Sequence, residues 1–102
     1  MHRYLREFIR YISLERRYSI NTIEAYQNDL QQFEAFLKDF FHSSKINWKL
    51  VDKRIIRGYL GWLGSQNIRK ISIARKLAAL KSYFKFLTRN NYLDINPTIT
   101  TR

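Results

Sequence analysis

The sequence predicts an all-α fold in which four helices pack as one small bundle. Apolar residues recur at steps of three and four along four segments, the spacing that lines one face of a helix, and no segment alternates like a strand. The 102 residues are 45% hydrophobic and 16% aromatic, which supplies enough apolar material for one core and excludes general disorder. We therefore expect a single domain.

The first two helices are expected over residues 2–17 and from about Asn21 to a polar break at residues 42–47. Asn21 and Glu24 have the spacing of a capping box, in which the Asn side chain accepts a backbone N–H and the Glu carboxylate reaches back. The apolar face of each helix should point into the core. These faces consist of Leu5, Phe8, Ile9 and Ile12 in the first helix, and of Ile23, Tyr26, Leu30, Phe33, Leu37 and Phe40 in the second.

The third helix is expected over residues 53–65, with Asp52 as its N-cap. All three glycines of the chain lie in this helix, although glycine within a helix costs about 1 kcal/mol relative to alanine. We attribute Gly58 and Gly61 to the close approach of a neighbouring helix, and Gly64 to a C-terminal cap. The apolar face consists of Ile56, Tyr59, Leu60 and Leu63.

The fourth helix, expected over residues 69–89, has two contrasting faces. Its apolar face consists of Ile73, Leu77, Leu80, Phe84 and Leu87. The opposite face mixes cations with small side chains, namely Arg75, Ser82 and Arg89 beside Ser72, Ala78 and Ala79. Small residues between cations allow a helix backbone to approach a polyanion closely, so this pattern favours nucleic acid as the partner. The helix should end in a left-handed residue near Asn90 or Asn91.

The net charge of +11 is unevenly distributed along the chain. Residues 1–20 carry a net charge of +3, residues 21–44 a net charge of −3, and residues 45–102 a net charge of +11. A one-sided positive field suits duplex DNA, although RNA or an anionic membrane surface would also attract it. No apolar run approaches the length of a membrane span and the apolar faces are accounted for by a core, so we expect no membrane partner.

The residue types that usually carry catalysis or bind metals form no recognisable site in this sequence. The chain has no cysteine, which excludes a thiolate metal site and is consistent with a reducing, cytoplasmic compartment. His2 and His42 lie far apart without a nearby carboxylate at ligand spacing, so we predict no metal, no cofactor and no enzymatic activity for this chain alone. We expect solvation, or ion pairs with the first helix, for the acids Glu24, Asp29, Glu34 and Asp39.

Three stretches resemble one protein family and occur in its order. Residues 18–30, YSINTIEAYQNDL, followed by Phe33, Phe36 and Leu37, resemble the motif S-x-N-T-x-x-A-Y-x-x-D-L-x-x-F-x-x-F-L of tyrosine recombinase N-terminal domains. Residues 72–87, SIARKLAALKSYFKFL, resemble the later motif T-I-x-R-x-L-S-A-L-R-x-F-Y-x-F-L, and Asn96-Pro97 resembles the N-P that ends the domain. The similarity is greatest to XerC/XerD-type recombinases and phage integrases.

This resemblance implies the core-binding domain of these enzymes, a four-helix SAM-like orthogonal bundle, over residues 1–95. Residues 96–102 would then begin a linker to a separate catalytic domain, which holds the family's catalytic arginines, lysine, histidines and nucleophilic tyrosine. In the family, the two domains grip opposite faces of a recombination site. The implied partners are double-stranded DNA and other recombinase protomers in the synaptic complex, and we expect the isolated domain to be a monomer.

The resemblance also implies which residues contact DNA, because the second and fourth helices of the family face the major groove. The matching candidates are Asn21, Thr22, Asn28, Arg69, Lys70, Ser72, Arg75, Lys76, Ala79 and Lys81. Arg75 would either read a guanine or contact a phosphate, and the sequence leaves that choice open. Ser72 stands where the family favours Thr, and Lys81 where it favours Arg, so the base preference is also open.

Two other functions fit a basic helical domain. A free-standing helix-turn-helix regulator, with residues 64–68 as the turn, would usually dimerise on a two-fold symmetric operator. A helical protein-interaction module would instead present its basic face to an acidic protein. Sedimentation would identify a dimeric regulator, and a nuclease-resistant pull-down would identify a protein partner.

Overall fold

The computed structural model describes residues 3–99 and confirms the all-α fold, since no strand occurs in that range. The elements are the α-helices α1 (Arg3–Leu14), α2 (Ile20–Phe41), α3 (Lys53–Ser65) and α4 (Lys70–Arg89), with a short 3-10 helix, η1 (Trp48–Leu50), before α3. Within residues 3–99, no helix combines the length and apolarity of a membrane span. His2, expected in the first helix, lies outside the described residues.

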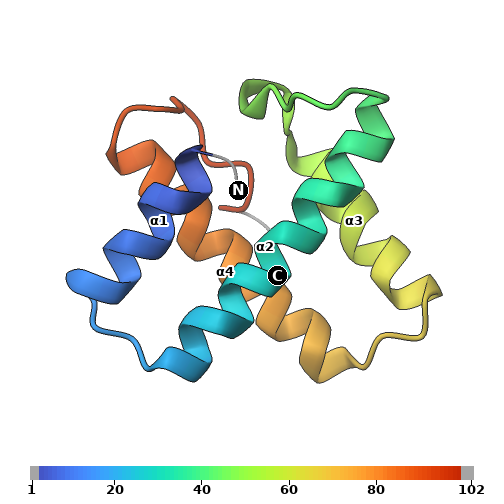
Figure 1. Cartoon of the computed structure of the whole chain (residues 1–102). Helices are drawn as coiled ribbons and strands as arrows, with labels where there is room; N and C mark the ends of the chain where they lie inside the picture. Colours follow the sequence, from blue (N-terminus) through green and yellow to red (C-terminus); the bar gives the residue numbers. More distant parts are fainter. Residues whose placement is uncertain (1–2, 100–102) are drawn as a thin grey trace.

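The helices form two consecutive pairs, α1 with α2 and α3 with α4, which meet where α2 and α4 cross (Figure 1). α1 packs against both α2 and α4, and α3 packs against α4. The first turns of α2 and α4 lie along the lower edge of the molecule in this view, together with the turns that precede them. The loop at residues 42–47 lies at the opposite, upper edge.

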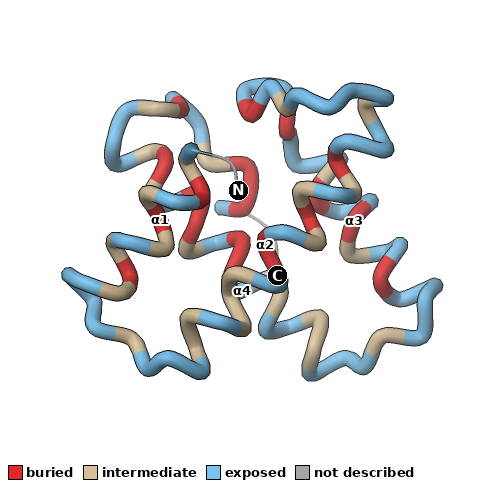
Figure 2. Tube along the Cα trace, in the orientation of Figure 1, coloured by how far each residue is buried: buried red, intermediate tan, exposed pale blue. Residues whose placement is uncertain are grey.

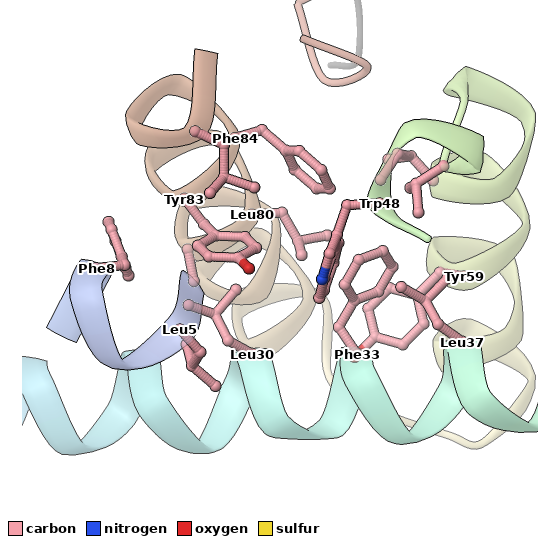
Figure 3. Packing of buried hydrophobic residues seen from close by; sticks show 14 of the residues in the cluster. Leu5, Phe8, Leu30, Phe33, Leu37, Trp48, Tyr59, Leu80, Tyr83 and Phe84 are labelled. Carbon is pink, nitrogen blue, oxygen red and sulfur yellow. The ribbon is translucent and has the colours of Figure 1, made fainter. Parts of the chain in front are cut away.

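Phe33 of α2 lies at the centre of an aromatic core (Figure 3). Its ring centroid is 4.9 Å from that of Tyr59 in α3, 6.2 Å from that of Phe84 in α4 and 6.2 Å from that of Trp48 in η1. Trp48 also meets the ring of Tyr83 edge-on at 5.3 Å. Such edge-to-face pairs stabilise a core by more than the area that they bury. Because the indole of Trp48 packs against Phe33 of α2 and Tyr83 of α4, η1 links the two helix pairs.

The start of α2 differs from the expected capping box at Asn21. Ser19 is the N-cap, because its side-chain oxygen accepts a hydrogen bond from the backbone N–H of Thr22 at 3.2 Å. Capping at Ser19 lets the preceding Tyr18 pack edge-on against Tyr26, with ring centroids 6.0 Å apart. Serine caps as well as asparagine does, and this aromatic contact favours the earlier start. Asn21 consequently lies exposed in the first turn.

The other helix ends largely follow the sequence-based expectation. Asp52 caps α3 as predicted, with its carboxylate accepting the N–H of Ile55 at 3.0 Å. Asn91, just beyond α4, has φ 61°, which confirms the left-handed stop. α1 ends at Leu14, short of the expected residue 17, because Arg17 adopts φ 52° and turns the chain toward α2.

The glycines of α3 do not serve the roles expected from the sequence. A Cβ added at Gly58 or Gly61 would meet nothing within 4 Å, so no neighbouring helix approaches closely there. Gly64 is not the C-terminal cap, because α3 continues to Ser65, Gln66 follows as the cap residue and no glycine has a positive φ. The described structure therefore shows no steric need for glycine at these positions.

The segment after α4 stays packed against the helices as far as Thr98. Leu93, Pro97 and Thr98 are buried, and the Thr98 hydroxyl donates to the side-chain oxygen of Asn96 at 2.7 Å. The linker expected to begin at residue 96 remains a prediction, since residues 100–102 lie outside the described range.

Candidate nucleic-acid interface

The candidate residues at the two helix starts lie along one exposed edge of the molecule. Asn21 and Thr22 belong to the first turn of α2, whereas Lys70 and Ser72 belong to the first turn of α4, directly after Arg69. Figure 2 shows this lower edge as exposed or intermediate throughout. The fold therefore brings groups about fifty positions apart in the sequence to the same edge.

The first turn of α4 provides a favourable environment for a bound anion. Acidic side chains usually stabilise a helix start, yet this turn contains none, and Arg69 at the N-cap position makes no side-chain capping bond. Both Arg69 and Lys70 are exposed. The N–H of Ile73 is bonded to the carbonyl of Arg69 at 3.0 Å, whereas the N–H groups before it have no intrahelical acceptor. The two cationic side chains and the positive end of the helix dipole therefore all favour the binding of an anion.

The start of α2 contributes polar but uncharged groups. The hydroxyl oxygens of Ser19 and Thr22 are 3.0 Å apart and hydrogen-bonded, and the first turn contains no acid. Asn21 and Asn28 are exposed on the same helix. Hydroxyl and amide groups of this kind donate to phosphate oxygens without adding charge.

A buried carboxylate joins α2 to α4 within this region. Asp29 is 2% exposed. The guanidinium of Arg75 binds it side-on, with Nε donating to Oδ2 at 3.0 Å and Nη2 donating to Oδ1 at 2.9 Å. Nζ of Lys76 also donates to Oδ1, at 2.9 Å. The cluster of one acid and two cations carries a net charge of +1. The buried carboxylate of Asp29 therefore does not make the surrounding surface negatively charged.

This cluster corrects the expected environment of Asp29, which is neither solvated nor paired with the first helix. Sequence spacing along α2 could not reveal a partner that lies in α4. The hydrogen bond from Arg75 to Asp29 raises the pKa of the guanidinium, which therefore stays charged. The Arg75 side chain is 49% exposed and still reaches solvent. The Lys76 side chain is only 12% exposed, and Asp29 holds its ammonium inside the cluster.

Ala79 is a wrong prediction, because it is fully buried in the core and cannot contact DNA. α4 packs against α1, α2 and α3, so it buries a wider arc than a helix with a single apolar face. Lys81 and Asn28 are exposed, whereas Ser72 is half-buried. These three remain available at the surface.

Two residues of this region were missed by the sequence-based choice of candidates. Asp29 lies beside the apolar stripe of α2, three residues after Tyr26 and next to Leu30. An acid placed beside an apolar stripe is the sequence signal that could have indicated a buried ion pair. Arg17 is exposed in the turn just before α2 and carries a positive φ of 52°. Its charge therefore adds to those along the same edge.

Comparison with known proteins identifies the family. The phage integrase N-terminal SAM-like domain matches residues 5–91, which include the aromatic core and the Asp29 cluster. The chain belongs to this family. The finding confirms the family predicted from the three sequence motifs, and it identifies the bundle as a SAM-like integrase domain.

The relatives of this SAM-like domain include tyrosine recombinases named XerC. Those of Pediococcus pentosaceus, Syntrophus aciditrophicus and Lacticaseibacillus casei are 37%, 36% and 39% identical over 90, 97 and 90 residues, respectively. These alignments cover 88–91% of the chain but only 29–31% of the length of the relatives. No solved structure matches the chain.

Proposed function

We propose that this SAM-like domain binds duplex DNA as the N-terminal half of the clamp that a tyrosine recombinase forms around its recombination site. The chain spans less than a third of the length of its XerC relatives. The remaining part of such a recombinase would grip the opposite face of the duplex, cut the DNA and rejoin it. The partners are therefore double-stranded DNA and further recombinase protomers.

The observation that carries this proposal is the cationic, acid-free first turn of α4. A duplex carries one negative charge per about 1.7 Å of its axis, so cations at a positive helix end gain affinity on any sequence. Arg69, Lys70 and Lys81 are exposed and serve as phosphate contacts. Asn21, Thr22, Asn28 and Ser72 add uncharged hydrogen bonds, and Arg75 is the candidate for base contact.

Fluorescence anisotropy with a labelled random-sequence duplex at low salt tests the proposal. The wild-type chain should bind, and Lys70→Ala should weaken binding to every duplex by a similar factor. Lys45→Ala is the matched control, because it removes the same charge from the exposed loop at the opposite edge (Figure 1). Absence of binding at low salt, or equal losses in both variants, would contradict the proposed interface.

Sedimentation of the isolated chain addresses the competing regulator hypothesis. A half-clamp needs no partner copy until the full-length recombinase assembles on DNA, so we expect a monomer. A stable dimer would favour a helix-turn-helix regulator, which places its two recognition helices one turn of DNA apart.

A further inference from the structure

The side-on pairing between Arg75 and Asp29 leaves part of the guanidinium unused. A guanidinium has five N–H groups in a fixed plane. Asp29 accepts one N–H from Nε and one from Nη2. The second N–H of Nη2 and both N–H groups of Nη1 remain. Two of these project together from the end of the side chain as a parallel pair of donors, which we call the free fork.

The burial of the two partners indicates that the free fork faces outward. Asp29 is 2% exposed and lies on the inner side of the pair, whereas the Arg75 side chain is 49% exposed. The exposed half of Arg75 is therefore the side away from the carboxylate. Lys76 donates to Oδ1 of Asp29 at 2.9 Å, which helps to fix the carboxylate from a second direction.

We propose that Asp29 is a positioning residue for sequence recognition, which holds Arg75 so that the free fork reads O6 and N7 of a guanine. This inference rests on the proposed DNA-binding function. Arginine presents two parallel donors to these guanine acceptors in the major groove. A guanidinium can approach a phosphate from many angles, whereas a guanine requires the free fork to lie in the plane of the base. Holding the guanidinium at two points therefore favours contact with a base over contact with a phosphate.

The test is selection of bound duplexes from a pool with a randomised central segment, followed by sequencing. The wild-type chain should enrich a guanine at one position. Asp29→Asn should reduce that preference roughly tenfold, which lies within the range for one bidentate arginine–guanine contact. Binding to unselected pool DNA should not weaken in parallel. A merely structural role for Asp29 would lower affinity for all sequences without changing the preferred base.

Glu34→Gln is the matched control for charge. It also removes one negative charge from α2, and Glu34 pairs with Lys38 of the same helix at 3.7 Å rather than with α4. The Glu34→Gln variant should therefore keep the guanine preference. Arg75→Lys keeps the cation but lacks the fork, so it should lose the preference even though it still binds pool DNA.

A measurement on the unmodified chain covers the case in which Asp29→Asn does not fold. The Nε–H resonance of Arg75, assigned by its loss in Arg75→Lys, should exchange with water more slowly than that of the exposed Arg57. Equal exchange rates would overturn the positioning role. So would a guanine preference that survives in folded Asp29→Asn, or a wild-type chain that binds the pool without any base preference. Failure to bind any duplex at low salt would instead overturn the proposed function itself.

Discussion

The stability of the fold should depend strongly on Asp29, since its carboxylate is buried between α2 and α4 and bonded to two cations. Removing one partner of a buried ion pair leaves the other charge uncompensated. We expect Asp29→Ala to lower the free energy of unfolding by about 3 kcal/mol. Urea denaturation followed by circular dichroism measures this loss. Glu24→Ala, at an exposed position of the same helix, should change stability by less than about 0.5 kcal/mol.

The same residues show what could not be predicted from the sequence. The basic face of the fourth helix followed from local periodicity, and Arg75 is indeed half exposed. The partner of Arg75 lies 46 positions away, and helical spacing alone gives no information on contacts at that separation. Ala79 was assigned to the wrong face for a related reason. The periodicity of one helix does not reveal how many neighbours that helix packs against.

At the scale of single elements, the N-cap of α3 should make stability depend on pH. A hydrogen bond from the N–H of Ile55 lowers the pKa of Asp52 below the ordinary value of 3.8. A depressed pKa stabilises the folded state above the ordinary pKa, and this contribution disappears as the pH falls through the lowered value. Asn caps a helix without titrating. The melting temperature of the wild type should therefore exceed that of Asp52→Asn at pH 7 by more than at pH 3, as measured by thermal circular dichroism.

Every other acid is common to the wild type and Asp52→Asn, so their contributions cancel in the difference between the two melting temperatures. A difference that is constant from neutral to acid pH would show that the Asp52 carboxylate contributes no charge-dependent stability to α3.

The exposed glycines of α3 should be replaceable at a gain in stability. An added Cβ at Gly58 or Gly61 meets nothing within 4 Å, and alanine lowers the conformational entropy of the unfolded chain. Each change to alanine should raise the free energy of unfolding by about 0.5–1 kcal/mol. Thermal melting should register this as a higher midpoint. Ala35→Gly, at an exposed position within α2, should lower stability by a similar amount.

A loss of stability in Gly58→Ala or Gly61→Ala would contradict this prediction and would mean that another group approaches α3 more closely than the described contacts allow. The sequence alone suggested such an approach, because a costly residue invites a steric explanation. Periodicity correctly gave the bounds of α3 itself, at residues 53–65, but the space around a helix depends on how its neighbours pack.

For the whole molecule, the order of elements was the most predictable feature. Local spacing and caps fix each helix, and the radius of gyration of 13.0 Å agrees with about 13 Å for one compact domain of this size. The insertion of Trp48 between the helix pairs was not predicted, because a three-residue 3-10 helix has no periodicity of its own. The convergence of two helix starts on one edge likewise depends on the crossing of α2 and α4.

The distribution of charge over the whole surface leads to a final prediction, on the salt dependence of DNA binding. Three exposed cations serve as phosphate contacts of the proposed interface, namely Arg69, Lys70 and Lys81, whereas Arg75 is assigned to base contact. Each neutralised phosphate contributes about −0.9 to the slope of log K against log salt, so these three predict a slope of about −2.7. Affinity should then fall roughly 40-fold between about 50 and 200 mM salt, as measured by anisotropy.

Lys70→Ala should make this slope shallower by about one, whereas Lys45→Ala at the opposite edge should leave it unchanged. A slope much steeper than about −2.7 would mean that further cations contact phosphates, and Arg17 beside the start of α2 is the first to test. A slope near zero would contradict electrostatic binding altogether, because an interface with this much exposed positive charge must release counterions from the duplex when it binds.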